Sequence, residues 1–250
     1  MSHLFDLPFE ILINITKDIL NLSICSRHFH DLLSFVKFND KVNFKKISNL
    51  SYFDSFTNVK YCESGKLFPK SLKILFWHNN DHLPSLLPNS LKSLDLDNYY
   101  NHPLPQLPNS LKSLYLGWHY NQPLSQLPNS LKSLYLGWHY NQSLPQLPDS
   151  LENLNLGYDY NQPLPDRVFD HNGMIIMGEP QLSDSLESLN LGHNYNHPLP
   201  SLPNSLKSLH LSSRYNHPLP SLPNSLKILK VQRDYPLPAL SSNINVEFFD

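Results

Sequence analysis

The side chains of this sequence that could perform chemistry are mainly histidine, serine and aspartate, and many of them recur at a fixed spacing. The 250 residues include 13 histidines but only two cysteines, Cys25 and Cys62. Histidine can act as a general acid or base, and its ring nitrogens can bind zinc. Many of the histidines recur in repeat columns, such as His102, His197 and His217 in one and His119 and His139 in another.

Such columns do not have the arrangement of a catalytic centre. Catalysis needs a few unlike groups that converge on one pocket, whereas a repeat places the same group at every turn of the chain. The sequence also contains no glycine-rich phosphate loop, no Cys-x-x-Cys pair and no His-Glu-x-x-His motif. Stacked histidines could bind zinc adventitiously, but we predict a non-catalytic protein without a cofactor or a functional metal site.

Composition and charge favour a soluble intracellular protein, cytoplasmic or nuclear. The formal net charge of -2 does not favour capture of nucleic acid. Two cysteines are too few for a disulfide framework. The N-terminus, MSHLFDLPFEIL, lacks the basic and apolar regions of a signal peptide, and no run of about 18 apolar residues exists to span a membrane. We therefore expect neither a nucleic-acid nor a membrane partner.

A repeat of 20 residues organises most of the chain. The segment QLPNSLKSLYLGWHYNQ occurs at 106–122 and again, unchanged, at 126–142, which indicates a recent duplication. Eight units, aligned on the first leucine of SLKSL, begin at Leu72, Leu91, Leu111, Leu131, Leu151, Leu186, Leu206 and Leu226, and a degenerate ninth unit places Ile244 at this position. A short period of this kind indicates a solenoid, in which each coil packs against its neighbours.

Each unit has the pattern of a short strand followed by an extended return. Leu114 and Leu116 alternate with an outward residue, as in a strand, and prolines such as Pro103 and Pro105 exclude a helix from the return. Stacked coils would place their strands about 4.8 Å apart in one parallel sheet. The leucines expected to point inward in one coil are Leu111, Leu114, Leu116, Leu124 and Leu127. Residues 67–250 are therefore predicted to form a mainly β, leucine-rich-repeat-like solenoid with proline-rich, non-helical returns.

Three further columns are expected to be structural. Tyrosine recurs at positions 100, 120, 140, 160, 195, 215 and 235, and asparagine follows it at 101, 121, 141, 161, 196 and 216. Buried asparagines could bond the backbone of the turn and form a ladder between coils. Lysine recurs at 73, 92, 112, 132, 207 and 227, with Glu152 and Glu187 in the same column. The two glutamates indicate a solvated face with partly relieved repulsion, and a nucleic-acid stripe is the alternative.

The period is broken once, by an insertion at about 166–180. The spacing from Leu151 to Leu186 is 35 residues, and the extra segment contains RVFD, HNG and MIIM. Two short strands around an Asn-Gly turn are the expected structure. The insertion is either a tolerated excursion from the coil surface or a hairpin that contacts a partner.

Residues 1–40 contain no repeat and are predicted to form two or three short amphipathic helices. Apolar residues lie at helical spacing, for example Ile11, Ile15 and Ile19, and Pro8 is suited to the start of the first helix. Residues 41–66 are interpreted as a junction that caps the first coil. Within it, Phe56, Val59 and Tyr61 could form an irregular strand.

These two regions resemble known families. LPFEILINI followed by LSICSRHFHDLL resembles the F-box, and the repeat SLKSLxLGxxYNQPLP resembles the FNIP repeat, a leucine-rich-repeat-like unit, with tyrosine in place of phenylalanine. Their combination is typical of F-box and FNIP repeat-containing proteins of amoebae and of the giant viruses that infect them. If the protein is viral, the resemblance implies the host cytoplasm.

The F-box resemblance implies a substrate-recognition subunit of a Skp-cullin-F-box-type ubiquitin ligase. Residues 1–40 would bind a Skp-family adaptor, and the repeats would bind an unknown protein substrate. The residues that match the motif are Leu7, Pro8, Glu10, Ile11, Ile15, Leu22, Cys25 and Phe29. Only 18 positions separate Leu7 from Cys25, fewer than in the usual pattern. The alternative is an interaction scaffold whose N-terminal helices only cap the solenoid.

The candidate partner-binding residues lie in the columns that vary from coil to coil. Side chains between and after the strand leucines should point away from the core on the sheet face. Exposed tyrosine and tryptophan are the residue types that dominate interface hot spots. The candidates are Tyr115, Trp118, Tyr135, Trp138, Tyr158 and His210. The alternative is that these side chains stack on one another and only shield the sheet.

Overall fold

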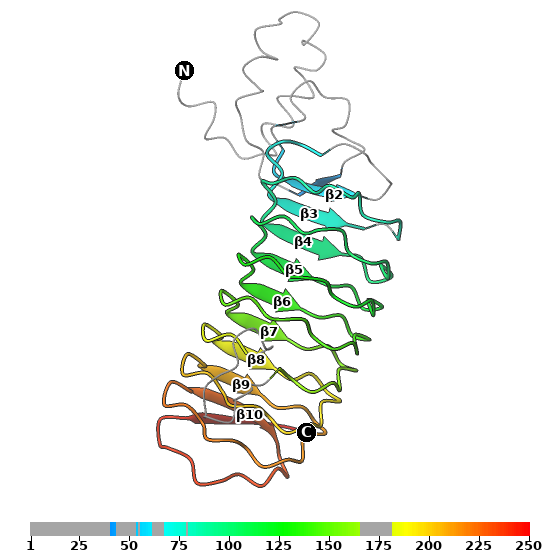
Figure 1. The fold of residues 1–250 in the computed structure, drawn as a ribbon. Helices are drawn as coiled ribbons and strands as arrows, with labels where there is room; N and C mark the ends of the chain where they lie inside the picture. The colour runs from blue at the N-terminus through cyan, green and yellow to red at the C-terminus, as the bar shows by residue number, and fades with distance from the viewer. Residues whose placement is uncertain (1–40, 44–53, 55, 62–67, 79, 166–181) are drawn as a thin grey trace, which may run out of the picture.

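The computed structural model of the chain describes residues 41–43, 54, 56–61, 68–78, 80–165 and 182–250. Eleven strands form a single parallel sheet in chain order. Figure 1 shows strands β2 to β10 stacked one after another along the molecule. The strands are β1 (Val42–Asn43), β2 (Asn58–Tyr61), β3 (Ile74–Trp77), β4 (Ser93–Leu96), β5 (Ser113–Tyr115), β6 (Ser133–Tyr135), β7 (Asn153–Asn155), β8 (Ser188–Asn190), β9 (Ser208–His210), β10 (Ile228–Gln232) and β11 (Asn245–Phe249).

Neighbouring coils pair in strict register, which confirms the predicted solenoid. Leu114 lies opposite Leu134, and Leu134 lies opposite Leu154. The 35-residue spacing does not disturb this register, because Leu154 lies opposite Leu189. The inserted residues 166–180 lie outside the described residues. The sheet therefore continues across the insertion as if the period were unbroken.

The sheet extends beyond the eight regular units at both ends. The expected irregular strand is β2, and Val59 and Phe56 beside it are buried. β1 pairs with β2 in parallel and was not predicted from the sequence. At the other end the amide of Ile244 donates to the carbonyl of Ser241, as the amide of Leu226 does to Pro223. Ile244 therefore closes the same turn as the first leucine of a regular coil.

The leucines form one continuous core along the solenoid. In the coil that contains β5, the five leucines predicted to point inward are at most 7% exposed: Leu111, Leu114, Leu116, Leu124 and Leu127. Each fully buried leucine contributes about 1.5–3 kcal/mol, against which the cost of ordering the chain must be set. No single coil encloses these side chains, so the stacking of coils provides the core.

Tyrosine rings fill a second column inside each coil. The rings of Tyr100, Tyr120, Tyr140, Tyr160 and Tyr195 are fully buried, and successive rings stack with centroids 6.2–6.3 Å apart. Burial raises the pKa of Tyr140 to about 12, and burial raises the pKa of Tyr215 to about 12 as well. The column is therefore structural, and its hydroxyl groups are held in the neutral form.

The asparagines form the expected ladder, but they are not buried as predicted. The side-chain Oδ1 of Asn101 accepts the backbone N–H of Asn121 at 2.9 Å, and Asn121 and Asn141 continue this pattern at the same distance. Asn101 and Asn141 are nevertheless exposed. The preceding tyrosine fills the core, and adjacent residues of an extended segment point to opposite sides.

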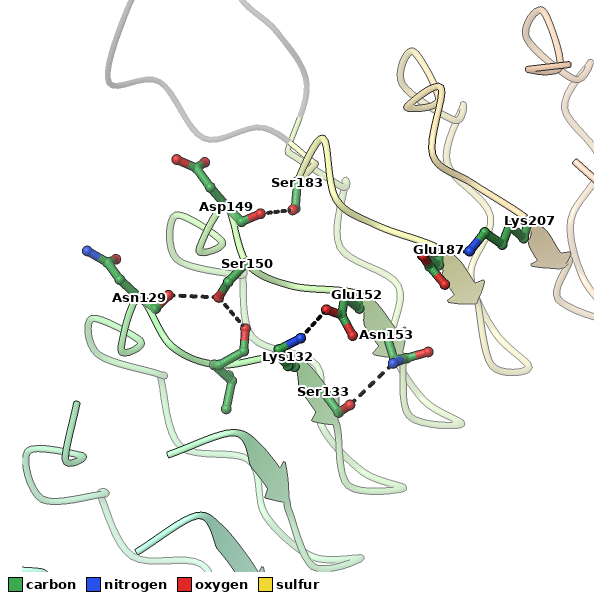
Figure 2. Close-up of polar contacts among 11 residues, drawn as sticks. Asn129, Lys132, Ser133, Asp149, Ser150, Glu152, Asn153, Ser183, Glu187 and Lys207 are labelled. Atoms are coloured by element: carbon green, nitrogen blue, oxygen red, sulfur yellow. Dashed lines mark hydrogen bonds and ion pairs between the residues drawn. The ribbon is translucent and has the colours of Figure 1, made fainter. Parts of the chain in front are cut away.

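A ladder of serines just before the strands, at the end opposite the asparagine ladder, was not predicted. The hydroxyl of the serine before each coil's first leucine donates to a leucine carbonyl of the preceding coil, as in Ser130 to Leu111 at 2.6 Å. Ser90, Ser110, Ser150, Ser205 and Ser225 repeat this bond at 2.5–2.7 Å. After the insertion, Ser183 donates to the carbonyl of Asp149 instead (Figure 2). A serine before a strand resembles any turn residue in sequence, which is why the signal was missed.

Glycine is required where the chain leaves β5 to β8. A Cβ atom on Gly137 would lie 2.0 Å from the carbonyl oxygen of Gly117 in the coil before it. Gly192 also has a φ of 71°, a left-handed conformation that side chains disfavour. These glycines allow neighbouring turns to approach as closely as the strands do.

Ser130→Ala should lower the free energy of unfolding by about 1 kcal/mol, because the carbonyl of Leu111 loses its hydroxyl partner. Chemical denaturation of the full chain measures the change. Ser125→Ala, in an exposed position of the adjacent return, is the matched control and should have no effect. Equal stabilities for the two variants would contradict a stabilising serine ladder.

Because the tyrosine column is buried, we predict that the free energy of unfolding falls as pH rises above 10. Tyrosine in the unfolded chain loses its proton near pH 10, whereas burial raises the pKa of Tyr140 and of Tyr215 to about 12. Between these values the unfolded state binds fewer protons than the folded state, so the free energy of unfolding decreases, and below pH 10 the contribution is fully present. Urea denaturation across this range measures the slope.

Tyr140→Phe removes one titrating group and should make that slope less steep. Tyr99→Phe, at an exposed position, should leave it unchanged. A free energy of unfolding that stays constant between pH 10 and pH 12 would contradict the prediction.

Candidate partner-binding surface

The outer face of the sheet carries the side chain that lies between the buried strand leucines of each coil. In β4 to β9 the inward leucines are buried and the intervening residues are at least partly exposed. This column contains Phe76, Asp95, Tyr115, Tyr135, Asn155, Asn190, His210 and Lys230. From Asp95 onward, its chemistry changes along the solenoid from acidic through aromatic and amide to basic.

Tyr115 and Tyr135 form the aromatic part of this face. Their rings stack with centroids 4.6 Å apart, and Tyr115 is 38% exposed. Tyr115 lies opposite Tyr135 in the sheet register, so the stacking follows directly from the spacing of the strands. Both side chains therefore occupy the position predicted for them.

Trp118, Trp138 and Tyr158, which were predicted from their place after the strand leucines, lie beyond the ends of the strands. Each follows the end of its strand by three residues and lies in the turn after the required glycine. The rings of Trp138 and Tyr158 stack at 4.5 Å, and Trp118 lies 5.6 Å from Trp138. His193 continues the stack beyond Tyr158 at 4.2 Å. The chain turns at the glycine, just before the aromatic residue, so these rings lie beside the sheet.

A second row runs through the same turns. The rings of Tyr99, His119 and His139 follow one another with centroids 5.3 and 5.1 Å apart. The Nδ1 atom of His139 lies 2.6 Å from a carboxylate oxygen of Asp159, whose other oxygen accepts the side-chain amide of Asn194 at 3.0 Å. These histidines are thus members of a row along the solenoid and do not converge on a pocket.

We call Tyr99, Tyr115, Trp118, Tyr135, Trp138 and Tyr158 together the aromatic patch. Five of them are exposed large hydrophobic side chains, with Tyr99 at 67% and Trp118 at 55%. They lie on four consecutive coils, at and after the ends of β4 to β7. Contact with one another and exposure to solvent occur together here, because stacking covers the ring faces and leaves the edges accessible. The predicted role in partner binding and the alternative, stacking that shields the sheet, are therefore compatible.

A groove continues the outer face beyond the aromatic patch. It has a volume of about 240 Å³. Its lining comes from β6 to β10 and consists of Tyr135, Asn153, Leu154, Asn155, Ser188, Leu189, Asn190, Ser208, His210 and Lys230. Burial and the charge of Lys230 lower the pKa of His210, and Lys230 forms an ion pair with Glu247 at 2.7 Å. The predicted candidate His210 therefore lines the same groove as Tyr135 but lies outside the aromatic patch.

The lysine column forms ion pairs between coils, as the two glutamates predicted. Lys132 pairs with Glu152, and Lys207 pairs with Glu187 at 2.6 Å (Figure 2). All four side chains are between a third and about half exposed, so each pair contributes little to stability. Because two glutamates interrupt the lysines of this column, it does not form a uniform basic stripe.

The described part of the chain contains no group of three or more histidine, cysteine, aspartate or glutamate side chains that could hold a metal ion. It also contains no helix long and apolar enough to cross a membrane. The residues predicted to bind an adaptor lie outside the described residues: Leu7, Pro8, Glu10, Ile11, Ile15, Leu22, Cys25 and Phe29. The structure therefore places the candidate partner-binding residues and not the candidate adaptor-binding residues.

Comparison with known proteins identifies the repeat. The model of the FNIP Repeat family matches residues 100–139, 140–169, 179–214 and 195–234, which together span half of the chain. No curated protein matches the sequence.

Two solved structures are similar to this chain. The crystal structure of CroV588, described as a novel circular LRR protein structure, is 25% identical and superposes with a TM-score of 0.51 over 85% of this chain. YopM from Yersinia enterocolitica WA-314 is 23% identical, with a TM-score of 0.40 over 76% of this chain. The chain spans 40% of CroV588 and 54% of YopM.

Proposed function

Because the chain belongs to the FNIP repeat family, we propose that it is a non-catalytic substrate receptor of a Skp-cullin-F-box-type ubiquitin ligase. Its solenoid is a leucine-rich-repeat-like protein-interaction module. In the proposed complex, residues 1–40 bind a Skp-family adaptor and the solenoid binds a protein substrate. The observation that carries the substrate-binding half is the aromatic patch, which exposes large rings on consecutive coils.

The aromatic patch has the physical properties of a binding hot spot. Tryptophan and tyrosine bury a large area with few rotatable bonds, and they dominate measured interface energies. The rings of Trp138 and Tyr158 are already stacked at 4.5 Å, so binding would immobilise little additional side-chain freedom. The preformed stack therefore supports a role in recognition in addition to shielding the sheet.

The adaptor-binding half rests on the resemblance of residues 1–40 to the F-box. Leu7, Pro8 and Glu10 match the start of that motif, and Cys25 and Phe29 match its end. An amphipathic helix that packs into a hydrophobic groove is a common mode of such binding. On the same resemblance we assign the protein to an amoeba or to a giant virus of amoebae, acting in the cytoplasm of the cell.

A scaffold without ligase engagement is the second candidate, and the position of β1 favours it. β1 is the first strand of the described sheet and follows directly after residues 1–40. An uncovered edge strand exposes unpaired backbone groups, so a solenoid needs a cap there. In this alternative, residues 1–40 provide only that cap.

Replacing Leu7 and Pro8 together with alanine should abolish co-purification of the full chain with a Skp-family adaptor, because both residues match the adaptor-contacting start of the motif. Co-expression followed by affinity purification measures the loss. The variant Trp138→Ala is the matched control and should retain the adaptor. Retention by the Leu7 and Pro8 variant, with folding intact by circular dichroism, would contradict the ligase assignment and favour the scaffold.

Trp138→Ala should weaken binding of the substrate by roughly tenfold or more, as expected of a central hot-spot residue. The measurement is quantitative capture from an amoeba lysate, followed by titration of the purified substrate. Leu86→Ala is the matched control, because Leu86 is 84% exposed but lies in a return segment outside the aromatic patch. Equal affinities of the wild type and of both variants would exclude the patch from substrate recognition.

A further inference from the structure

We propose that the groove on the outer face of β6 to β10 binds an extended peptide segment of a protein partner, with an acidic side chain at the Lys230 end and an apolar side chain at the Tyr135 end. This inference rests on the proposed function in one respect, that the partner of the solenoid is a protein. It adds the chemical class of the bound segment and its direction along the solenoid axis.

The groove is created by a difference in side-chain size along one column. Tyr135 and His210 are large, whereas Asn155 and Asn190 between them are short. These four residues lie in neighbouring strands and pair in register, so the short side chains form a depression between the large ones, and Lys230 lies one strand beyond His210. The resulting volume is about 240 Å³.

The floor of the groove matches the hydrogen-bonding groups of a peptide backbone. The polar side chains on the floor beside Tyr135 and His210 are all neutral amides and hydroxyls, which both donate and accept: Asn153, Asn155, Ser188, Asn190 and Ser208. An extended peptide presents alternating N–H and C=O groups, and each needs a partner when it is removed from water. A neutral floor with both kinds of group satisfies this need.

In two of these asparagines, one polar atom of the side-chain amide already forms a hydrogen bond that orients the group. The Nδ2 of Asn153 donates to the hydroxyl of Ser133 at 3.3 Å, and the Oδ1 of Asn190 accepts the amide of Gly192 at 2.9 Å. No described residue bonds the Oδ1 of Asn153 or the Nδ2 of Asn190. One acceptor and one donor are therefore held in place for a ligand, which reduces the entropy lost on binding.

The length of the groove sets the length of the segment. Four strand-to-strand steps separate Tyr135 in β6 from Lys230 in β10. At about 4.8 Å per step, this corresponds to roughly 19 Å, or about six residues of an extended chain. The apolar and acidic side chains of the partner should therefore be separated by about five positions.

Charge fixes which end of the segment is acidic. Lys230 is the one charged residue in the lining of the groove, and its partner Glu247 is not part of that lining. The ammonium group has three donors, so it can hold Glu247 and a carboxylate of the partner at the same time. At the opposite end, Tyr135 is stacked on Tyr115 and offers an apolar wall. A nucleic acid is disfavoured, because a phosphate backbone requires several cations in a row.

The test measures binding of fluorescein-labelled peptides of about six residues to the full chain by fluorescence anisotropy. The first pair carries tyrosine at one end, aspartate at the other, and serine and threonine between them. One peptide of the pair has tyrosine at its N-terminus and the other has it at its C-terminus. A second pair replaces aspartate with lysine. The aspartate peptide in one of the two directions should bind about tenfold more tightly than its lysine counterpart.

Charge-exchange variants separate the groove from the rest of the surface. Lys230→Glu combined with Glu247→Lys retains the ion pair with exchanged charges and should reverse the preference, so that the lysine peptide binds about tenfold more tightly. The matched control is Lys207→Glu combined with Glu187→Lys, an ion pair on the sheet edge outside the groove, and it should change nothing. Asn155→Leu should weaken both peptides about tenfold without changing their ratio.

Several outcomes would overturn the inference. These are no binding by any peptide, equal binding of aspartate and lysine peptides, the same reversal in the Lys207 and Glu187 control, or tighter binding of a single-stranded RNA oligonucleotide of similar length. If the peptides fail while Trp138→Ala still weakens the substrate, the groove inference alone is wrong. If Trp138→Ala has no effect while the peptides bind as expected, the groove stands and the assignment of the aromatic patch is wrong.

Discussion

Every part of this structure depends on the stacking of one coil on the next at the distance of paired strands. A coil of 20 residues has no interior of its own, so Leu114 is buried only because Leu94 and Leu134 lie on either side of it. The same stacking satisfies polar groups: the asparagine and serine ladders each join one coil to its neighbour. A residue that prevents the close approach, such as any side chain at Gly137, would disturb both the apolar and the polar contacts.

The stacking of coils constrains the residues in the inward columns and leaves those in the outward columns free to vary. The buried tyrosine and leucine columns are nearly uniform along the chain, whereas the outer column changes from Asp95 to Tyr115, Asn155 and Lys230. Exact register then places neighbouring outward side chains in contact, so a run of aromatic residues becomes a stack and a run of asparagines becomes a polar floor. Specificity in such a molecule comes from the order of residues along one column.

Register also explains how histidine and charged side chains are arranged in the described coils. Groups at equivalent positions lie side by side in rows, as His119 and His139 do, or form pairs between coils, as Lys207 and Glu187 do. The surface that results is suited to contact over several coils, which is the geometry of recognition.

The sequence by itself determined the period, the parallel sheet and the inward leucines, because these follow from spacing that repeats in every unit. It also determined the ion pairs of Lys132 and Lys207, since opposite charges occupy one column. Only the tertiary structure decided what depends on the path of the turn. It placed Trp118 and Trp138 beside the sheet, exposed Asn101 while keeping its ladder, and made Ser130 a donor to the coil before it. The groove between Tyr135 and Lys230 likewise arises from side-chain sizes on five different coils. Periodicity specifies which residues align, whereas the direction and depth of each side chain are set by how closely neighbouring coils pack.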